Sequence, residues 1–268
     1  MSDTQLSDHI SKTYKATRKG LAYIAIALPL LLLFGGYFLA KLHLQGSMSA
    51  YYHASPISQA AELLNPHSHV HPGEGIMRNW FVGLLFALGI ILILYRGFTR
   101  MENFALSLAG IMGLGVALFP MPWGDTFKAV EFTVLGIRCS LHGACAVALF
   151  LCIAYVCIFR ASDTLQLIKD IKECKRYRVA YKWLGWAMIV SPFTAFLLSS
   201  VFHKNNAYTF FIELAGIWVF AAYWLVKSHE ISKSDADGKA ARGELQVVDE
   251  GKRHPFRKIQ IQEKLSSK

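Results

Sequence analysis

Long apolar runs alternate with shorter polar segments along the chain. A helix that crosses a bilayer needs about 20 apolar residues, because the hydrocarbon core is about 30 Å thick and each helical residue advances about 1.5 Å. Six runs come near this length: residues 21–40, 79–95, 104–121, 139–159, 183–202 and 209–226. The pattern predicts an all-α protein, a bundle of six transmembrane helices.

The composition agrees with a membrane protein. Hydrophobic residues make up 54% of the chain and charged residues 17%, which excludes a disordered chain and disfavours a water-soluble globule. The net charge of +10 is concentrated in the segments between the runs. We therefore expect membrane lipids as partners, and we expect no nucleic-acid partner.

Lysine and arginine are divided unequally between the two sides of the predicted bundle. Of the 28 residues, 23 lie before the first run, after the second, after the fourth and after the sixth, and the other 5 lie on the opposite side. The positive-inside rule then places both termini of a multi-pass membrane protein in the cytoplasm. The first run exceeds the apolar core of a signal peptide, so we interpret it as an uncleaved helix.

Three further segments are polar or amphipathic. Residues 1–20 form a basic arm and residues 160–182 have an amphipathic pattern, so we expect both to lie along the anionic inner leaflet. Beyond residue 227 the apolar content falls and charges alternate, which predicts a disordered cytoplasmic tail at 228–268. Partner binding by this tail is the alternative.

Small residues recur every four positions in the third, fourth and fifth runs. The third run carries Ala105, Ala109, Gly113 and Ala117. Because small residues let helix backbones approach closely in lipid, we expect these three helices to form the packed centre of the bundle. A homodimer through the small-residue faces is the alternative use.

Unusual polar residues gather on the predicted outer side. Asn79, His142 and Glu213 each fall near the first turn of a helix that begins outside. Ionisable groups inside a bilayer are costly, so each one is a functional candidate. We expect His142 and Glu213 to pair across two helices, either as a structural contact or as part of a ligand site.

The long loop at 42–78 lies at the same outer mouth and is rich in histidine. If the mouth is functional, Tyr52, His53 and Arg78 would line its entrance, and Asn79 would orient the polar network. These residues, with His142 and Glu213, are the candidate ligand-binding set.

The histidines also allow a metal hypothesis. Imidazole binds zinc, copper and nickel, and alternating histidines present their rings on one side of an extended strand. The candidate ligands are His53, His67, His69, His71 and His142. A polar loop without metal is the other interpretation, so no cofactor is assured.

The segment from Ser49 to His53 resembles the Ser-x-x-x-His pattern of the CREST superfamily of membrane hydrolases, which includes alkaline ceramidases and adiponectin-receptor-like proteins. This resemblance implies a zinc-dependent hydrolase acting on a lipid. The chain departs from the family in having six predicted helices rather than seven and in having Asn79 where an acid would be expected. Its His-x-x-x-His, at His67 and His71, lies in the loop rather than near the last helix.

A broader resemblance is to an uncharacterised bacterial family of multi-pass membrane proteins. It would cover most of residues 20–228 and implies a six-helix bundle in a bacterial inner membrane, without implying an activity. The similar segments are Ser47–His53, Arg78–Gly83, Tyr95–Gly97, Gly115–Pro120, Leu141–His142 and Trp224–Lys227.

Two classes of function remain at this point. The favoured one is a non-enzymatic membrane protein that binds, senses or passes a small ligand, lipid or ion through the outward mouth. The alternative is a metal-dependent hydrolase that acts on a lipid at the bilayer surface.

Overall fold

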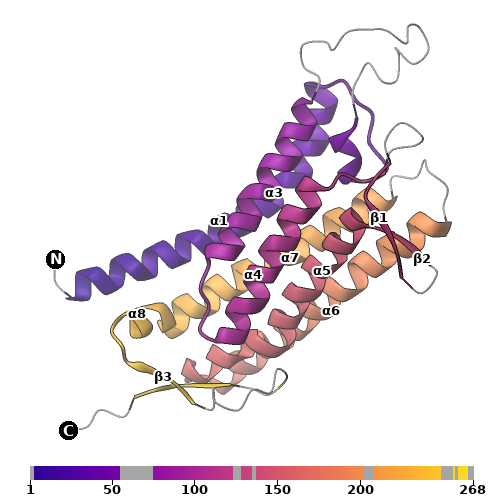
Figure 1. Ribbon diagram of the computed structural model, residues 1–268. Helices are drawn as coiled ribbons and strands as arrows, with labels where there is room; N and C mark the ends of the chain where they lie inside the picture. The colour runs from indigo at the N-terminus through magenta and orange to yellow at the C-terminus, as the bar shows by residue number, and fades with distance from the viewer. Residues whose placement is uncertain are drawn as a thin grey trace, which may run out of the picture.

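The computed structural model describes residues 3–54, 75–122, 128–134, 137–201, 208–248, 256 and 259–264 (Figure 1). Most of these residues are helical. The long helices are α1 (Asp3–Phe38), α3 (Ile76–Leu94), α4 (Arg100–Leu118), α5 (Leu141–Tyr155), α6 (Ile171–Val201) and α7 (Tyr208–Ser234).

Shorter elements join these helices. A 3-10 segment, η1 (Ser49–Tyr52), lies between α1 and α3, and α5 continues through a π-helical turn, η2 (Val156–Arg160), into the 3-10 segment η3 (Ala161–Leu167). The short helix α8 (Ala236–Ala241) follows α7. Two antiparallel hairpins pair β1 (Glu131–Val134) with β2 (Ile137–Ser140), and β3 (Leu245–Val248) with β4 (Gln260–Glu263).

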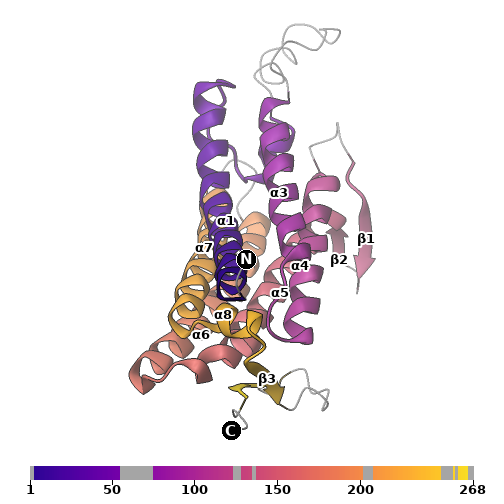
Figure 2. The ribbon, with the colours of Figure 1, turned by 90° about the vertical axis from the view of Figure 1, so that its left-hand side faces the viewer.

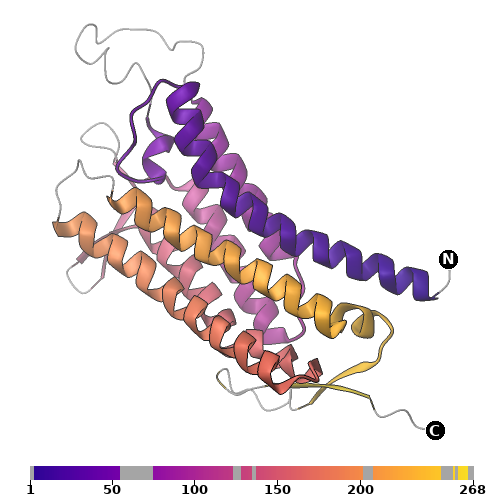
Figure 3. The same cartoon turned by 180° about the vertical axis from the view of Figure 1, so that it is seen from behind.

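The six long helices form a closed ring. Each packs against the next in chain order, from α1 to α3, α4, α5, α6 and α7, and α7 packs against α1 again. Seen from the side the ring has two layers, with α1, α7 and α6 in one and α3, α4 and α5 in the other (Figures 2 and 3). Both chain ends lie toward the end of the ring that carries α8, which we call the α8 end; the opposite end carries η1 and is called the η1 end (Figure 1).

Five helical segments in the described part of the chain are long and apolar enough to cross a membrane. They are α1, α3, α4, α7 and the continuous run from α5 to η3. Each overlaps one of the apolar runs predicted from the sequence, so a mostly helical protein with helices long and apolar enough to span a membrane is confirmed. The fifth predicted run, 183–202, overlaps the second part of α6.

Glycines set the closest approach within the ring. A Cβ atom added at Gly110 of α4 would lie 2.5 Å from the carbonyl oxygen of Gly89 in α3, so these two backbones touch. Ala105 and Ala109 are buried on the same helix. This close contact joins α4 to α3, which is the second predicted run, whereas the third, fourth and fifth runs were expected to form the packed centre. A homodimer through the small-residue faces stays a prediction.

The basic segments are parts of longer helices rather than separate interfacial ones. The arm at 1–20 is continuous with α1 from Asp3 onward, and residues 171–182 form the first turns of α6. Lysine, arginine and alanine are good helix formers, so nothing in either segment stops the helix before the apolar run begins. Only η3 and its following turn separate α6 from the preceding helix.

The predicted disordered tail is wrong for much of its length. Helix α7 continues to Ser234, and α8 and the β3–β4 hairpin then fold against the α8 end. Ile261 and Ala236 are buried against Leu167 of η3. Ile259, which precedes β4, and Ile261 within it are both buried. Residues two apart face the same side of an extended chain, a short pattern that the surrounding charges concealed.

Candidate functional site

The η1 end is built by a chain reversal after α1. Lys41 takes a left-handed conformation with φ of 53°, and the backbone amide of Leu42 donates to the carbonyl of Gly36 at 2.9 Å. The chain then returns toward the ring, where the amide of Phe210 in α7 donates to the carbonyl of Gly46 at 3.0 Å. Segment η1 is thereby seated among the ends of the helices, with Tyr51 fully buried.

Two of the predicted residues, Glu213 and His142, bind the two consecutive residues at the start of this segment, Met48 and Ser49. The Glu213 carboxylate accepts a hydrogen bond from the Met48 amide at 2.6 Å, and the His142 Nε2 lies 2.8 Å from the Ser49 hydroxyl. The predicted direct pairing of His142 with Glu213 is therefore not the arrangement found. Each group is bonded instead to the returning loop, which offered closer backbone and hydroxyl partners.

The orientation of His142 is fixed by its other ring nitrogen. Nδ1 lies 3.0 Å from the carbonyl oxygen of Val116 and 2.8 Å from that of Phe119, at the end of α4. A carbonyl only accepts hydrogen bonds, so Nδ1 carries the proton in the neutral ring. Nε2 then has a lone pair, and the Ser49 hydroxyl donates to it.

Helix α5 places His142 at this point because it begins one residue earlier. The Ser140 hydroxyl caps the helix by accepting from the Gly143 amide at 3.1 Å, which is the usual role of serine before a first turn. The histidine ring thus reaches the last carbonyls of α4, which have no partners within their own helix.

The other predicted entrance residues are Tyr52, His53, Arg78 and Asn79, and the first three make side-chain contacts. His53 Nε2 bonds the Met121 carbonyl at 3.0 Å, and Arg78 lies over the Tyr52 ring at 5.8 Å. Burial, together with the Arg78 charge, lowers the pKa of His53. Asn79 is exposed and bonds through its backbone amide to Gly75, so its predicted orienting role is not seen.

The metal hypothesis falls partly outside the described residues, because His67, His69 and His71 do. Within the ranges that the structure describes, no three histidine, cysteine, aspartate or glutamate side chains are grouped so that they could hold a metal ion. His53 and His142 are both at the η1 end, but each has a carbonyl partner. Zinc binding stays a prediction.

A cavity of about 110 Å³ lies beneath η1 and inside the ring. Its wall comes from α1, α3, α4, α5 and α7 and from the loop at Met48 and Ser49. Of the residues that line it, only Ser49 and Glu213 carry polar side chains; the others include Leu85, Leu149 and Phe220. The cavity is therefore an apolar chamber with its polar groups at the η1 end.

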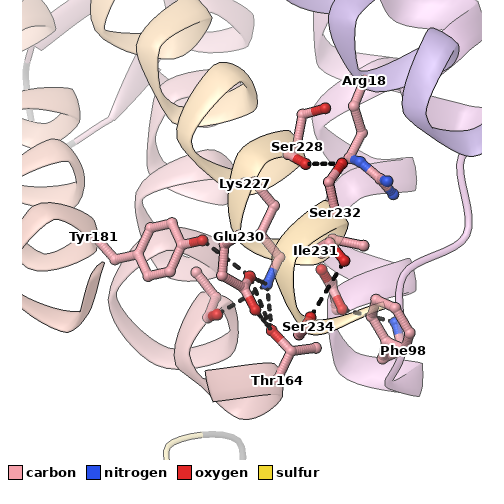
Figure 4. Close-up of polar contacts among 12 residues, drawn as sticks. Arg18, Phe98, Thr164, Tyr181, Lys227, Ser228, Glu230, Ile231, Ser232 and Ser234 are labelled. Atoms are coloured by element: carbon pink, nitrogen blue, oxygen red, sulfur yellow. Dashed lines mark hydrogen bonds and ion pairs between the residues drawn. The ribbon is translucent and has the colours of Figure 1, made fainter. Parts of the chain in front are cut away.

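A second polar cluster at the α8 end was not predicted (Figure 4). The Lys227 ammonium group donates to the Ala161 carbonyl at 2.9 Å, to the Thr164 hydroxyl at 2.7 Å and to the Glu230 carboxylate at 2.8 Å. Thr164 and Tyr181 also donate to Glu230, at 2.9 and 3.1 Å. All three ammonium hydrogens of Lys227 are thus used.

A neighbouring ion pair joins α1 to α8. Arg18 of α1 forms a two-point ion pair with Asp237 of α8 and donates to the Tyr95 hydroxyl at 3.2 Å. Burial raises the pKa of Tyr95, so its phenol stays neutral beside the guanidinium group. Arg18 and Asp237 lie 219 positions apart in the sequence, so nothing local signals this contact.

Glu102 is buried at the same end but has a local explanation. Its backbone amide donates to the Thr99 hydroxyl, and its carboxylate accepts from the Phe98 amide at 2.9 Å. This reciprocal pattern caps the start of α4. A sequence signal for the larger cluster did exist in Lys227 and Glu230, which lie three residues apart and share one face of a helix.

Comparisons of the chain with protein-family models, with curated proteins and with solved structures gave no match.

Proposed function

We propose that this chain is an integral membrane protein that binds a small amphipathic molecule in the cavity beneath η1. The observation that supports this proposal is the distribution of polarity around the chamber, which has apolar walls and two polar side chains at one end. A ligand with an apolar body and a single polar head matches that distribution. The function class favoured from the sequence was binding through an outward mouth, and this chamber is the binding site that we propose for it.

The membrane arrangement belongs to the same proposal. Five helical segments are long and apolar enough to cross, and residues 183–201 of α6, from the fifth predicted run, supply a sixth crossing. The unequal distribution of lysine and arginine then orients the α8 end, with both termini, toward the cytoplasm of an inner membrane. Exposed Lys172, Lys175 and Lys182 on α6 would face its anionic leaflet.

The head of the ligand is constrained by Glu213. In the described residues no cationic side chain is paired with this carboxylate, which accepts a hydrogen bond from the Met48 amide. An amine or hydroxyl can donate a hydrogen bond to it, whereas a second carboxylate would be repelled. We therefore assign the ligand to short-chain molecules whose head is an amine or is neutral, such as an alcohol or its ester, rather than to carboxylates.

The size of the chamber limits the apolar body. Cavities of about 150 Å³ lined by leucine, isoleucine and phenylalanine are known to bind a molecule as large as benzene. The present chamber, at about 110 Å³, suits a single ring or a short alkyl chain. Because Met48 and Ser49 form part of its wall, displacement of η1 would open it.

Photo-crosslinking tests this proposal. A hexylamine that carries a diazirine on its chain is applied to the full-length protein in lipid nanodiscs, and cross-linked peptides are mapped by mass spectrometry. We expect adducts on the parts of α5 and α7 that line the chamber, and weaker labelling by the matching carboxylate probe. Labelling that is confined to lipid-facing residues would overturn the proposal.

Two neighbouring residues of α5 provide a matched pair of variants. Ala146 lines the chamber, whereas Val147 is 40% exposed on the outside of the ring. Ala146→Phe should fill the space and reduce cavity cross-linking at least tenfold, and Val147→Phe should leave it unchanged. Equal effects of the two substitutions would show that the probe reports on the surrounding lipid.

The orientation is tested separately. Single cysteines are introduced at Lys12 and at Lys41 of a variant without native cysteines, and each is labelled in intact cells with a thiol reagent that does not cross the membrane. We expect labelling at position 41 and not at position 12. The reverse pattern would overturn the assignment of the η1 end to the outside.

A further inference from the structure

We infer that Ser49 and His142 form a nucleophile and base pair that hydrolyses a short-chain ester bound in the cavity, an inference that rests on the proposed binding function. It differs from a metal-dependent mechanism, because the hydroxyl itself attacks. It requires three features of the site: an activated hydroxyl, a correctly oriented base, and a place for the acyl chain.

The first two features follow from the hydrogen bonds of His142. Its Nε2 lies 2.8 Å from the Ser49 hydroxyl, within the distance for proton transfer from a nucleophile to a base. Its Nδ1 is held by the carbonyls of Val116 and Phe119, so the lone pair is on the nitrogen that faces the serine. In serine hydrolases a carboxylate usually orients the histidine; here two peptide carbonyls do so.

The same carbonyls stabilise the charged form of the base. Phe119 caps α4, and the end of a helix carries a partial negative charge from its unpaired carbonyls. When Nε2 takes a proton, the positive imidazolium keeps its Nδ1 hydrogen bonds and lies against this negative helix end. The site is therefore arranged for a histidine that gains and loses a proton in turn.

The third feature is the position of Ser49 on the wall of the chamber. It begins η1 and is one of the two polar side chains that line the apolar cavity. An acyl chain that occupies the cavity would bring its ester carbonyl to the η1 end, beside this hydroxyl. The hydroxyl of Ser47, two residues earlier, instead donates to the Met121 sulfur and accepts from the Ala50 amide.

The reaction balances without an oxidant or reductant. The Ser49 oxygen bonds to the ester carbon as its proton passes to Nε2, and the bond from that carbon to the alcohol oxygen then breaks. The departing alcohol takes the proton from Nε2, which leaves an acyl group on Ser49. A water molecule then attacks the acyl carbon, transfers a proton through Nε2 back to the serine oxygen, and releases the acid.

A hexyl fluorophosphonate tests the activation of Ser49, because it reacts with activated serines in place of an ester carbonyl. Full-length protein in nanodiscs is incubated with the probe, and the adduct is located by mass spectrometry. We expect one adduct on Ser49 and a burst of about one equivalent of nitrophenol from p-nitrophenyl hexanoate. An adduct elsewhere, or none, would overturn the inference.

Three variants separate activation from simple exposure. Ser49→Ala should abolish the adduct, and His142→Gln should slow its formation at least about 100-fold, the usual contribution of a general base. Ser47→Ala is the matched control and should react at the rate of the unmodified chain. Wild-type reactivity of His142→Gln would also overturn the inference.

The diazirine hexylamine distinguishes this inference from the binding proposal. If the amine cross-links in the cavity but the fluorophosphonate forms no adduct, the chamber binds its ligand and the serine is not a nucleophile. If the amine fails to cross-link, the binding proposal itself is wrong. Cross-linking of His142→Gln by the amine verifies that this variant keeps its fold.

Discussion

The η1 end and the α8 end of the ring both bury polar side chains, yet they use them differently. At the η1 end, Glu213 and His142 bind a short returning segment whose removal would open an apolar chamber. At the α8 end, Lys227 and Glu230 are bonded to each other and to the surrounding helices, and both are fully buried. The polar groups of the η1 end hold a short loop segment in place, whereas those of the α8 end bond the long helices to one another.

The difference lies in what remains after one partner is lost. Removing a carboxylate at the η1 end leaves a neutral peptide amide without its acceptor, a moderate cost. Removing one charge at the α8 end leaves the opposite charge unpaired in a dry interior, which is much more costly. The α8 end should therefore dominate the stability of the whole ring, and the η1 end should govern access to the cavity.

Lys227→Met gives the largest expected effect. It leaves the Glu230 carboxylate buried without its cation, and we expect a loss of about 3–5 kcal/mol in the free energy of unfolding. Unfolding of the protein in mixed micelles by increasing amounts of sodium dodecyl sulfate measures this loss. Lys233→Met removes a half-exposed pair with Glu173 and should cost far less than Lys227→Met, because solvent-exposed ion pairs contribute little to stability.

The double variant Lys227→Met, Glu230→Gln checks the stated cause. Because it removes both charges, it should be more stable than Lys227→Met alone. If the double variant is less stable by the sum of the two single losses, the unpaired charge is not the reason for the effect.

Two glycines of α4 provide the next comparison, in the part of the ring between the two ends. A Cβ at Gly110 would meet the Gly89 carbonyl at 2.5 Å, whereas a Cβ at Gly113 would have its nearest neighbour, the Gly89 Cα, at 3.8 Å. Gly110→Ala should force α3 and α4 apart and cost about 1–3 kcal/mol, measured by the same unfolding assay. Gly113→Ala should be neutral or slightly stabilising, and equal losses would contradict the close contact.

The helices could be predicted, although not their arrangement in a ring, because the signal for each helix is local. Apolar length identifies each helix by itself, and a helix needs no distant partner to satisfy its backbone in lipid. The η1 end was identified because His142 and Glu213 are conspicuous in apolar runs, although their partners, Met48 and Ser49, could not be chosen from the sequence. A backbone amide and a serine hydroxyl carry no distinctive pattern.

The α8 end escaped prediction because its charges resemble ordinary interfacial residues. Arg18 belongs to a basic segment before the first apolar run, and Asp237 belongs to a tail with alternating charges. The ion pair between them depends on where α1 and α8 meet in space. Counting charged residues on each predicted side of the membrane assigns such residues to a side but does not show that they are buried.

Glu213→Ala should have a more local effect, confined to the η1 end. It removes the acceptor of the Met48 amide, and we expect a cost of about 1–3 kcal/mol for the attachment of η1. Hydrogen exchange should therefore quicken at the amides of Ala50 and Tyr51 and stay unchanged at the α8 end. Glu213→Gln retains an acceptor oxygen and is the control; quickened exchange throughout the ring would instead indicate a global role.

The smallest expected effect is a pH dependence that originates in His53 and is confined to the η1 end. The pKa of this histidine is lowered by burial and by Arg78 relative to an unfolded value of about 6.5, so the unfolded loop binds more protons in the interval below 6.5. The neutral ring consequently favours the seated loop above pH 6.5, and this contribution is lost as the pH falls through the lower pKa of the folded form. Exchange at Ala50 and Tyr51, corrected for its intrinsic pH dependence, should quicken over that interval.

His142 is the other imidazole at this end, so the control must separate the two. His53→Gln keeps a side chain that can donate to the Met121 carbonyl but does not titrate, and it should flatten the part of the pH profile that belongs to His53. An unchanged profile in His53→Gln would show that the proton is taken up elsewhere at the η1 end. A matching change at the amides of α8 would show that the two ends are not independent. A proton gained beneath the loop would then also loosen the helices that Lys227 and Arg18 hold at the α8 end.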